Sequence, residues 1–103
     1  MKVKLNSGVE YWVSFYHNNY SEYDTTTQKE LTSNTNCIIV NELNPGIKAS
    51  AFAFLAKGDI FCKDRGRKIA LRRALNQLGL SKEVRTLFWN EYHLMTNKLK
   101  RIK

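Results

Sequence analysis

The chain has few cysteines and no long hydrophobic run, and both shortages restrict what it can be. Cys37 and Cys62 are its only cysteines, and with two histidines they provide neither a disulfide framework nor a set of zinc ligands. No apolar stretch approaches the roughly 20 residues of a membrane span, and the N-terminal MKVKLNSGVEYW lacks an apolar signal core. We therefore expect one cytoplasmic domain over residues 1–103 without a membrane partner. Both thiols should be reduced and packed as small apolar side chains.

Catalytic signatures are also missing. The sequence contains no G-x-S-x-G, H-E-x-x-H or Walker-type phosphate-loop motif, and His17 is far from His93 along the chain. No nucleophile and base stand at an interpretable spacing, and no group of side chains suggests a metal or another cofactor. The sequence therefore predicts a protein that is not an enzyme, with no catalytic residues, no metal site and no cofactor.

Acidic residues are scarce in the second part of the chain. Residues 1–62 contain five lysines and arginines and six acids, whereas residues 63–103 contain twelve lysines and arginines and three acids. The net charge of +8 therefore arises from the second segment. A field of one sign favours a polyanionic or acidic partner, although small basic proteins also carry such charge for solubility alone.

Alternating and continuous apolar patterns predict three strands. In residues 9–20 (VEYWVSFYHNNY), β-branched and aromatic residues alternate with a second face that is only partly polar. The continuous apolar centre of 35–43 (TNCIIVNEL) predicts an interior strand buried on both faces. In 47–56 (IKASAFAFLA), alanines oppose phenylalanines, which suits close packing of a helix on one face.

The connections are predicted from polar residues, proline and glycine. Pro45 followed by Gly46 indicates a type II turn that closes a hairpin. The polar stretch 21–34 reads as a long loop or a ragged hairpin end. Residues 3–5 could add a short further strand.

Helical periodicity begins after residue 57. Asp59 or Asp64 could cap the first helix, and Gly79 is a suitable residue just beyond its end. Ser81 could cap a second helix with Glu83 in its first turn. The apolar stripe of the first helix is Ala70, Leu71, Ala74, Leu75 and Leu78. That of the second is Val84, Leu87, Phe88, Tyr92, Met95, Leu99 and Ile102.

These elements predict an α+β fold. We expect a three-stranded, possibly four-stranded, mainly antiparallel sheet with two C-terminal helices packed on one face, in the order βββαα. The sheet would occupy residues 1–57, and the basic helical half would occupy residues 58–103.

Cations gather at the start of the first predicted helix. Arg65, Lys68 and Arg72 would lie along one side of it, where they could contact successive phosphates or grip carboxylates of an acidic protein. Gly66 costs up to ~1 kcal/mol in a helix, which indicates a close backbone approach to a ligand phosphate or to the neighbouring strand. The predicted contact residues are Lys63, Arg65, Arg67, Lys68, Arg72, Arg73, Lys98, Lys100 and Arg101.

Aromatic residues crowd the N-terminal third of the chain. Exposed rings beside cations bind single-stranded nucleic acid by stacking, and exposed tyrosine and tryptophan also anchor protein interfaces. The alternative is that most of these rings belong to the core. We expect Trp89, in the second predicted helix, to be partly buried in the core as well. The candidate aromatic contacts are Trp12, Tyr16 and Tyr20.

Two segments, DIFCKDRGRKIALRRAL (59–75) and EVRTLFWNEY (83–92), resemble small uncharacterised proteins of bacteriophages and prophages. The similar pattern is D-x-F, a cationic spacer, G-R-x-I-A-L and R-A-L, then R-x-x-x-W-x-x-Y. Arg72 stands where this resemblance leads us to expect a small residue. The resemblance implies a phage origin and the host cytoplasm as location, and it supplies no activity or catalytic residue. Small phage proteins of this kind commonly bind nucleic-acid machinery, and some block defence nucleases such as CRISPR effectors.

Two classes of function fit these observations. In the first, the protein modulates or inhibits a host nucleic-acid-handling complex through its basic helix, as anti-CRISPR proteins do, so its partner is a nucleoprotein enzyme or an acidic protein surface. In the second, it binds DNA or RNA directly as an accessory or regulatory protein. The resemblance favours the first class, and no known nucleic-acid-binding motif supports the second.

Overall fold

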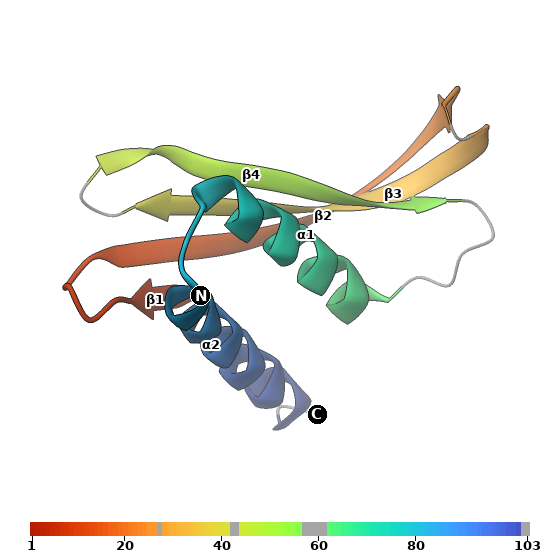
Figure 1. Ribbon diagram of the computed structural model, residues 1–103. Coiled ribbons are helices and arrows are strands. Elements are labelled where there is room, and N and C mark those ends of the chain that lie inside the picture. Colours follow the sequence, from red (N-terminus) through yellow and green to blue (C-terminus); the bar gives the residue numbers. More distant parts are fainter. Residues whose placement is uncertain (27, 42–43, 57–61, 102–103) are drawn as a thin grey trace.

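The computed structural model describes residues 1–26, 28–41, 44–56 and 62–101, which form a four-stranded antiparallel sheet followed by two helices (Figure 1). The strands lie in the spatial order β1-β2-β3-β4, and every neighbouring pair is antiparallel. This confirms the predicted α+β fold, and a short strand at the N-terminus supplies the fourth member of the sheet. The elements are β1 (Lys2–Lys4), β2 (Glu10–Asp24), β3 (Lys29–Asn41), β4 (Asn44–Ala56), α1 (Lys63–Leu78) and α2 (Lys82–Arg101).

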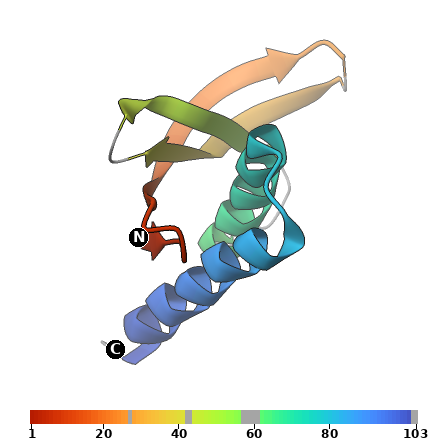
Figure 2. The ribbon, with the colours of Figure 1, turned by 60° about the vertical axis from the view of Figure 1, so that its left-hand side comes forward.

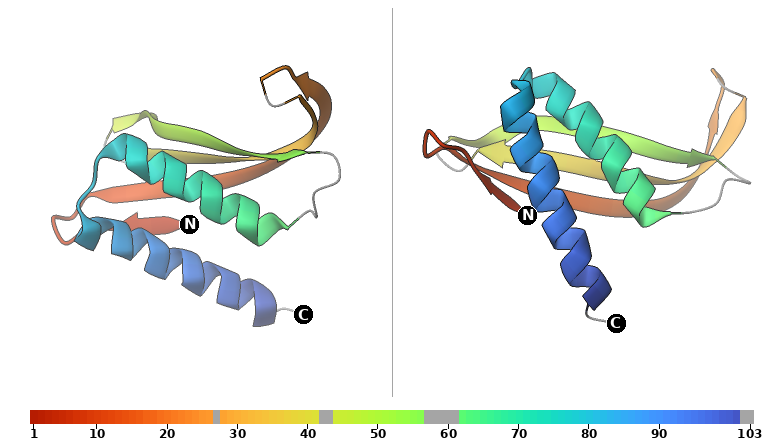
Figure 3. Two further views of the ribbon diagram at one scale, coloured as in Figure 1. Left: turned by 45° about the vertical axis from the view of Figure 1, so that its right-hand side comes forward. Right: turned by 60° about the horizontal axis from the view of Figure 1, so that its bottom comes forward.

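Both helices lie on the same face of the sheet (Figures 1 and 2). Helix α1 crosses β3 and β4, whereas α2 lies near β1 and extends beyond the sheet at its C-terminal end (Figure 3). Two ring contacts fasten α2 to β2: Tyr11 with Phe88 at 5.6 Å between centroids, and Phe15 with Tyr92 at 5.9 Å. Neither helix, over the residues described, has the length and apolarity needed to cross a membrane.

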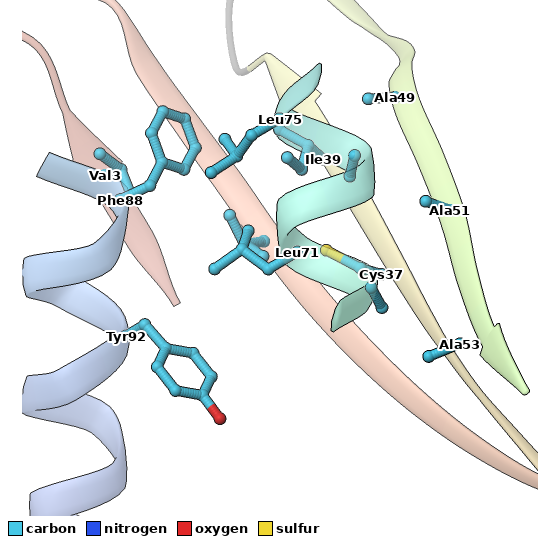
Figure 4. Close-up of a cluster of buried hydrophobic side chains, with 13 residues drawn as sticks. Val3, Cys37, Ile39, Ala49, Ala51, Ala53, Leu71, Leu75, Phe88 and Tyr92 are labelled. Atoms are coloured by element: carbon cyan, nitrogen blue, oxygen red, sulfur yellow. The ribbon is translucent and has the colours of Figure 1, made fainter. Parts of the chain in front are cut away.

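The core lies between the sheet and the helices (Figure 4). On β4 the buried side chains are small, and they face the small buried residues of α1, as the alternation of alanine and phenylalanine predicted. Close approach of the helix follows because methyl groups occupy little space between the two backbones. Burial of each large side chain, such as Phe88, contributes roughly 1.5–3 kcal/mol. The buried alanines are Ala49, Ala51, Ala53, Ala70 and Ala74.

Gly66 marks the tightest approach of α1 to the sheet. A Cβ atom at this position would lie 2.6 Å from Thr35 Oγ1 and 3.3 Å from Thr35 Cβ. The glycine therefore allows the first turn of α1 to pack against β3. Of the two explanations that the sequence offered, the structure supports close approach to the neighbouring strand.

The helix ends are mostly as predicted. Gly79 ends α1 in the left-handed conformation, with φ 63°. The Val84 amide donates to Ser81 Oγ at 3.4 Å, so Ser81 caps α2. The predicted Asp64 cap is wrong, because Cys62 holds the cap position and Asp64 lies inside the first turn. There its carboxylate still faces the positive end of the helix dipole. Asp59 falls outside the described residues.

The predicted loop at 21–34 is wrong, whereas the alternative of a hairpin end is correct. Strand β2 continues to Asp24 and β3 begins at Lys29. A register shift between Asn19 and Glu22 interrupts the pairing, and the end of this hairpin bends away from the helices (Figures 1 and 3). Polar residues form strands here because the backbone N–H and C=O groups of β2 and β3 hydrogen-bond to each other.

The predicted turn at Pro45 and Gly46 is also wrong. Both residues belong to β4, and Gly46 has no positive φ. The hairpin that they were expected to close does exist, since β3 pairs with β4 and Asn41 is the register partner of Asn44. Residues 42–43 lie outside the described residues.

The prediction that the strand at 35–43, which is part of β3, is buried on both faces is wrong as well. Cys37 and Ile39 are fully buried under the helices, whereas Ile38 and Val40 on the opposite face are only half-buried. Cys37 and Cys62 are both free thiols, but the expectation that both are buried or half-buried apolar residues fails for Cys62, which is exposed beside α1. Neither α1 nor α2 covers this second face of the sheet (Figure 2), and we call it the open face.

Candidate binding surfaces

The outer side of α1 presents three cations. Arg65, Lys68 and Arg72 are all exposed, as the helical spacing predicted, and we call them the α1 stripe. Its ends are about 10 Å apart along the helix, from a rise of ~1.5 Å per residue. Lys68 Nζ lies 3.0 Å from Asp64 Oδ2, an exposed pair of small energetic value. Arg65 and Arg72 form no hydrogen bond or ion pair within the described part of the chain.

Arg67, also a predicted contact residue, connects the two helices instead. Its Nε donates to the Tyr92 hydroxyl at 3.3 Å, and that hydroxyl donates to Asp64 Oδ1 at 2.5 Å. The hydrogen bond from Tyr92 holds the pKa of Asp64 below its usual range, helped by Lys68. Burial, then the bond to Asp64, raises the pKa of Tyr92 to about 12. This cluster stabilises the fold and leaves Arg67 half-buried.

Arg73 and Gln77 occupy the outer edge of β4. Arg73 Nη1 donates to the Phe52 carbonyl at 2.7 Å. Gln77 accepts from the Ser50 amide at 3.1 Å and donates to the Ser50 carbonyl at 2.7 Å. Arg73 was predicted as a contact residue, and in the structure its guanidinium already donates to a carbonyl of the edge strand.

A histidine lies beneath the first turn of α1. His17 Nδ1 is 2.8 Å from Thr35 Oγ1. Burial lowers the pKa of His17, and the charges of Arg67 and Lys63 lower it further. In the described ranges, no group of three His, Cys, Asp or Glu side chains could hold a metal ion. His17 and Thr35 are consistent with a role in packing the first turn of α1 against the sheet.

The open face carries exposed aromatic rings, and we call Trp12, Tyr16, Phe52 and Phe54 the sheet platform. Phe52 and Phe54 stack on each other with centroids 5.8 Å apart and planes 21° from parallel. Trp12 and Tyr16 had been predicted as aromatic contacts, whereas the two phenylalanines had not. The exposed fractions are 45% for Trp12, 52% for Tyr16, 40% for Phe52 and 54% for Phe54.

Amide side chains separate the rings. Tyr16, Asn36 and Phe52 form one row across β2, β3 and β4. In the next row, Asn18 Nδ2 donates to Asn34 Oδ1 at 3.0 Å. The middle of the open face is therefore polar at this end of the sheet.

Lysines lie at the margins of the open face. Lys2 and Lys4 are exposed, and the pairing of β1 with β2 sets Lys2 opposite Trp12 and Lys4 opposite Glu10, so both lie on the side of Trp12. Lys2 Nζ lies 5.4 Å from the centre of the Trp12 ring and 3.2 Å from Glu10 Oε2. These lysines were not predicted as contacts, because the excess positive charge of the chain lies in residues 63–103, outside the sheet.

The two surfaces lie on opposite sides of the molecule, since the α1 stripe faces away from the sheet.

No protein-family model, curated protein or solved structure matches the chain. The described side chains do not include the remaining predicted contacts, which are Tyr20, Lys98, Lys100 and Arg101.

Proposed function

We propose that the protein is a non-catalytic binding protein of the host cytoplasm that modulates or inhibits a nucleic-acid-handling complex, in the manner of phage anti-defence proteins. The α1 stripe would dock on an acidic surface of that complex. One observation supports this most directly: Arg65 and Arg72 stand exposed on one side of a helix without carboxylate partners in the described part of the chain. Exposed guanidinium groups without a carboxylate partner can form bidentate contacts with the carboxylates of another protein.

The tight packing of α1 on the sheet favours such docking. Leu71 and Leu75 are buried, and Gly66 brings the first turn against β3, so the helix backbone is ordered before any partner binds. Less conformational freedom is then lost on association. The excess positive charge would accelerate encounter with an acidic surface and make it depend on salt concentration.

Affinity capture tests the proposal. The immobilised protein is incubated with nuclease-treated bacterial lysate, the retained proteins are identified, and the activity of any retained nucleic-acid-handling complex is measured with added protein. We expect such a complex to be retained and its activity to fall. Retention of no such complex, or retention with unchanged activity, would contradict the proposal.

Two charge-matched variants locate the contact. The double variant Arg65→Gln with Arg72→Gln removes two charges from the α1 stripe, and Lys48→Gln with Lys82→Gln removes two exposed charges elsewhere. Capture should weaken at least about tenfold in the first, the equivalent of ~1.4 kcal/mol, and remain in the second. Arg73 is left intact because it bonds to β4. Equal weakening in both variants would mean that only net charge matters.

A further inference from the structure

We propose that the open face of the sheet binds single-stranded nucleic acid, with bases stacked on the rings of the sheet platform. Every ring of the platform is two-fifths or more exposed. Base–aromatic stacking is tolerant of sequence and is worth roughly 1–3 kcal/mol per base. The occupant would be a strand with unpaired bases, because the base faces of a duplex are already covered by their neighbours.

The positions of the rings suit several bases at once. The rings of Phe52 and Phe54 stack on each other with centroids 5.8 Å apart, so each ring offers its other face to a base. Tyr16 lies in the row of Phe52 but two strands away, at ~10 Å. One short oligonucleotide crossing β4 toward β2 could therefore use three rings.

The polar groups between the rings suit the edges of bases. Ser50 Oγ lies 3.2 Å from Asn36 Oδ1, in the same part of the face as the bond between Asn18 and Asn34. A side-chain amide has two donor hydrogens and two acceptor lone pairs, so each asparagine retains capacity beyond these bonds. Amides pair well with the mixed donors and acceptors of nucleobases.

Charge favours a polyanionic strand over a second copy of this chain. Lys2 and Lys4 both lie on the open face, and Lys2 offsets the carboxylate of Glu10, so Lys4 leaves this end of the face positively charged. Two such faces brought together would oppose like charges. A protein partner fits less well, because interface anchors cluster at the centre of a patch. Here the rings surround a centre that contains Asn36.

The site does not depend on the function proposed for the α1 stripe. It lies on the opposite face and shares no residue with the stripe, so either proposal can fail while the other stands. Removing ring faces should leave capture of the complex unchanged, and removing charges of the α1 stripe should leave the preference for single strands unchanged.

Fluorescence anisotropy tests the open face directly. The probes are labelled 12-nucleotide RNA and DNA single strands and the corresponding duplexes, each at ~50 and ~200 mM salt. We expect both single strands to bind at least about tenfold tighter than their duplexes, with affinity falling as salt rises. Tighter binding of RNA than of DNA would add a contact to the 2′-hydroxyl.

Variants then assign the binding to the rings. Phe52→Ala and Phe54→Ala should each weaken single-strand binding about tenfold, which corresponds to ~1.4 kcal/mol and lies within the range for loss of one stacked base. Phe54→Tyr keeps an aromatic face and should bind like the wild type. Leu94→Ala is the matched control, because it removes an equally exposed apolar side chain from α2. Thermal unfolding followed by circular dichroism verifies that each variant is folded.

Three results would overturn the proposal. The first is equal affinity for single strands and duplexes, which would indicate attraction by charge alone. The second is wild-type affinity in folded Phe52→Ala and Phe54→Ala, or equal losses in Leu94→Ala. The third is a wild-type dimer in size-exclusion chromatography that Phe52→Ala dissociates, which would show that a second copy covers the open face.

Discussion

The contact between Gly66 and Thr35 makes a quantitative prediction about stability. In Gly66→Ala, the new Cβ would stand 2.6 Å from Thr35 Oγ1, whereas ordinary van der Waals contact begins at 3.4 Å. Thr35 is buried on an interior strand and contacts His17. Either α1 moves away from β3 or the Thr35 hydroxyl rotates and loses its partner. Overpacking of this kind costs about 1–3 kcal/mol, and the lost hydrogen bond costs ~1 kcal/mol.

Helix propensity acts in the opposite direction. Replacing glycine by alanine in a helix stabilises it by up to ~1 kcal/mol. We therefore expect Gly66→Ala to lower the free energy of unfolding by about 1–3 kcal/mol. The midpoint of thermal unfolding would fall by roughly 4–8 °C for each kcal/mol. Urea denaturation followed by circular dichroism measures the change.

A double-mutant cycle isolates the contact. In the Thr35→Ala background the obstructing oxygen is absent, so Gly66→Ala should be neutral or stabilising there, and the two substitutions should couple by ~1 kcal/mol or more. Asn76→Ala, at an exposed position of α1, shows the gain from propensity alone. A Gly66→Ala protein as stable as Asn76→Ala would refute the reasoning.

Three further predictions concern titratable groups. Tyr92→Phe should cost about 1–2 kcal/mol in urea denaturation at pH 7, and the difference from wild type should shrink below pH ~4. The reason is that the pKa of Asp64 is depressed in the folded protein, so its stabilisation is lost as the pH falls through that lowered value. The pKa of His17 is also lowered by folding, so its protonation opposes folding, and the unfolding free energy should fall as the pH drops below about 6.5. His17→Gln should flatten this decline, and an unchanged decline would assign it to other groups. Cys62 should react with a thiol reagent in the native protein, whereas Cys37, its pKa raised by burial to about 12, should react only after denaturation. Rapid native reaction of both thiols would contradict the burial of Cys37.

Much of the fold was predictable because its signals are local. Alternation around Val13 and the opposition of alanine to phenylalanine on β4 each depend on neighbouring residues. The extension of β2 to Asp24 was not predictable in this way. Its polar residues carry no apolar pattern, and the pairing with β3 is made by backbone groups that every sequence possesses.

The site was predictable only in part, for a related reason. Spacing placed Arg65, Arg67 and Arg73 in one cationic cluster, but their environments differ. Arg67 bonds to Tyr92 on the other helix, and Arg73 bonds to a carbonyl of β4. Both partners are more than 20 residues away along the chain. A pattern of charges shows where cations gather and cannot show which of them the fold already uses.

The bonds from α1 to the edge of β4 have a consequence for self-association. The run AFAFLA at the end of β4 combines aromatic and aliphatic residues with no charge and no proline, the composition of segments that form fibrils. A strand with a free edge can recruit the same segment of another molecule. Gln77 occupies the Ser50 amide and carbonyl much as a neighbouring strand would, and Arg73 occupies the next outward carbonyl. Docking of α1 thus protects the start of this aggregation-prone stretch, and concentrated solutions should stay clear for as long as that helix remains in place.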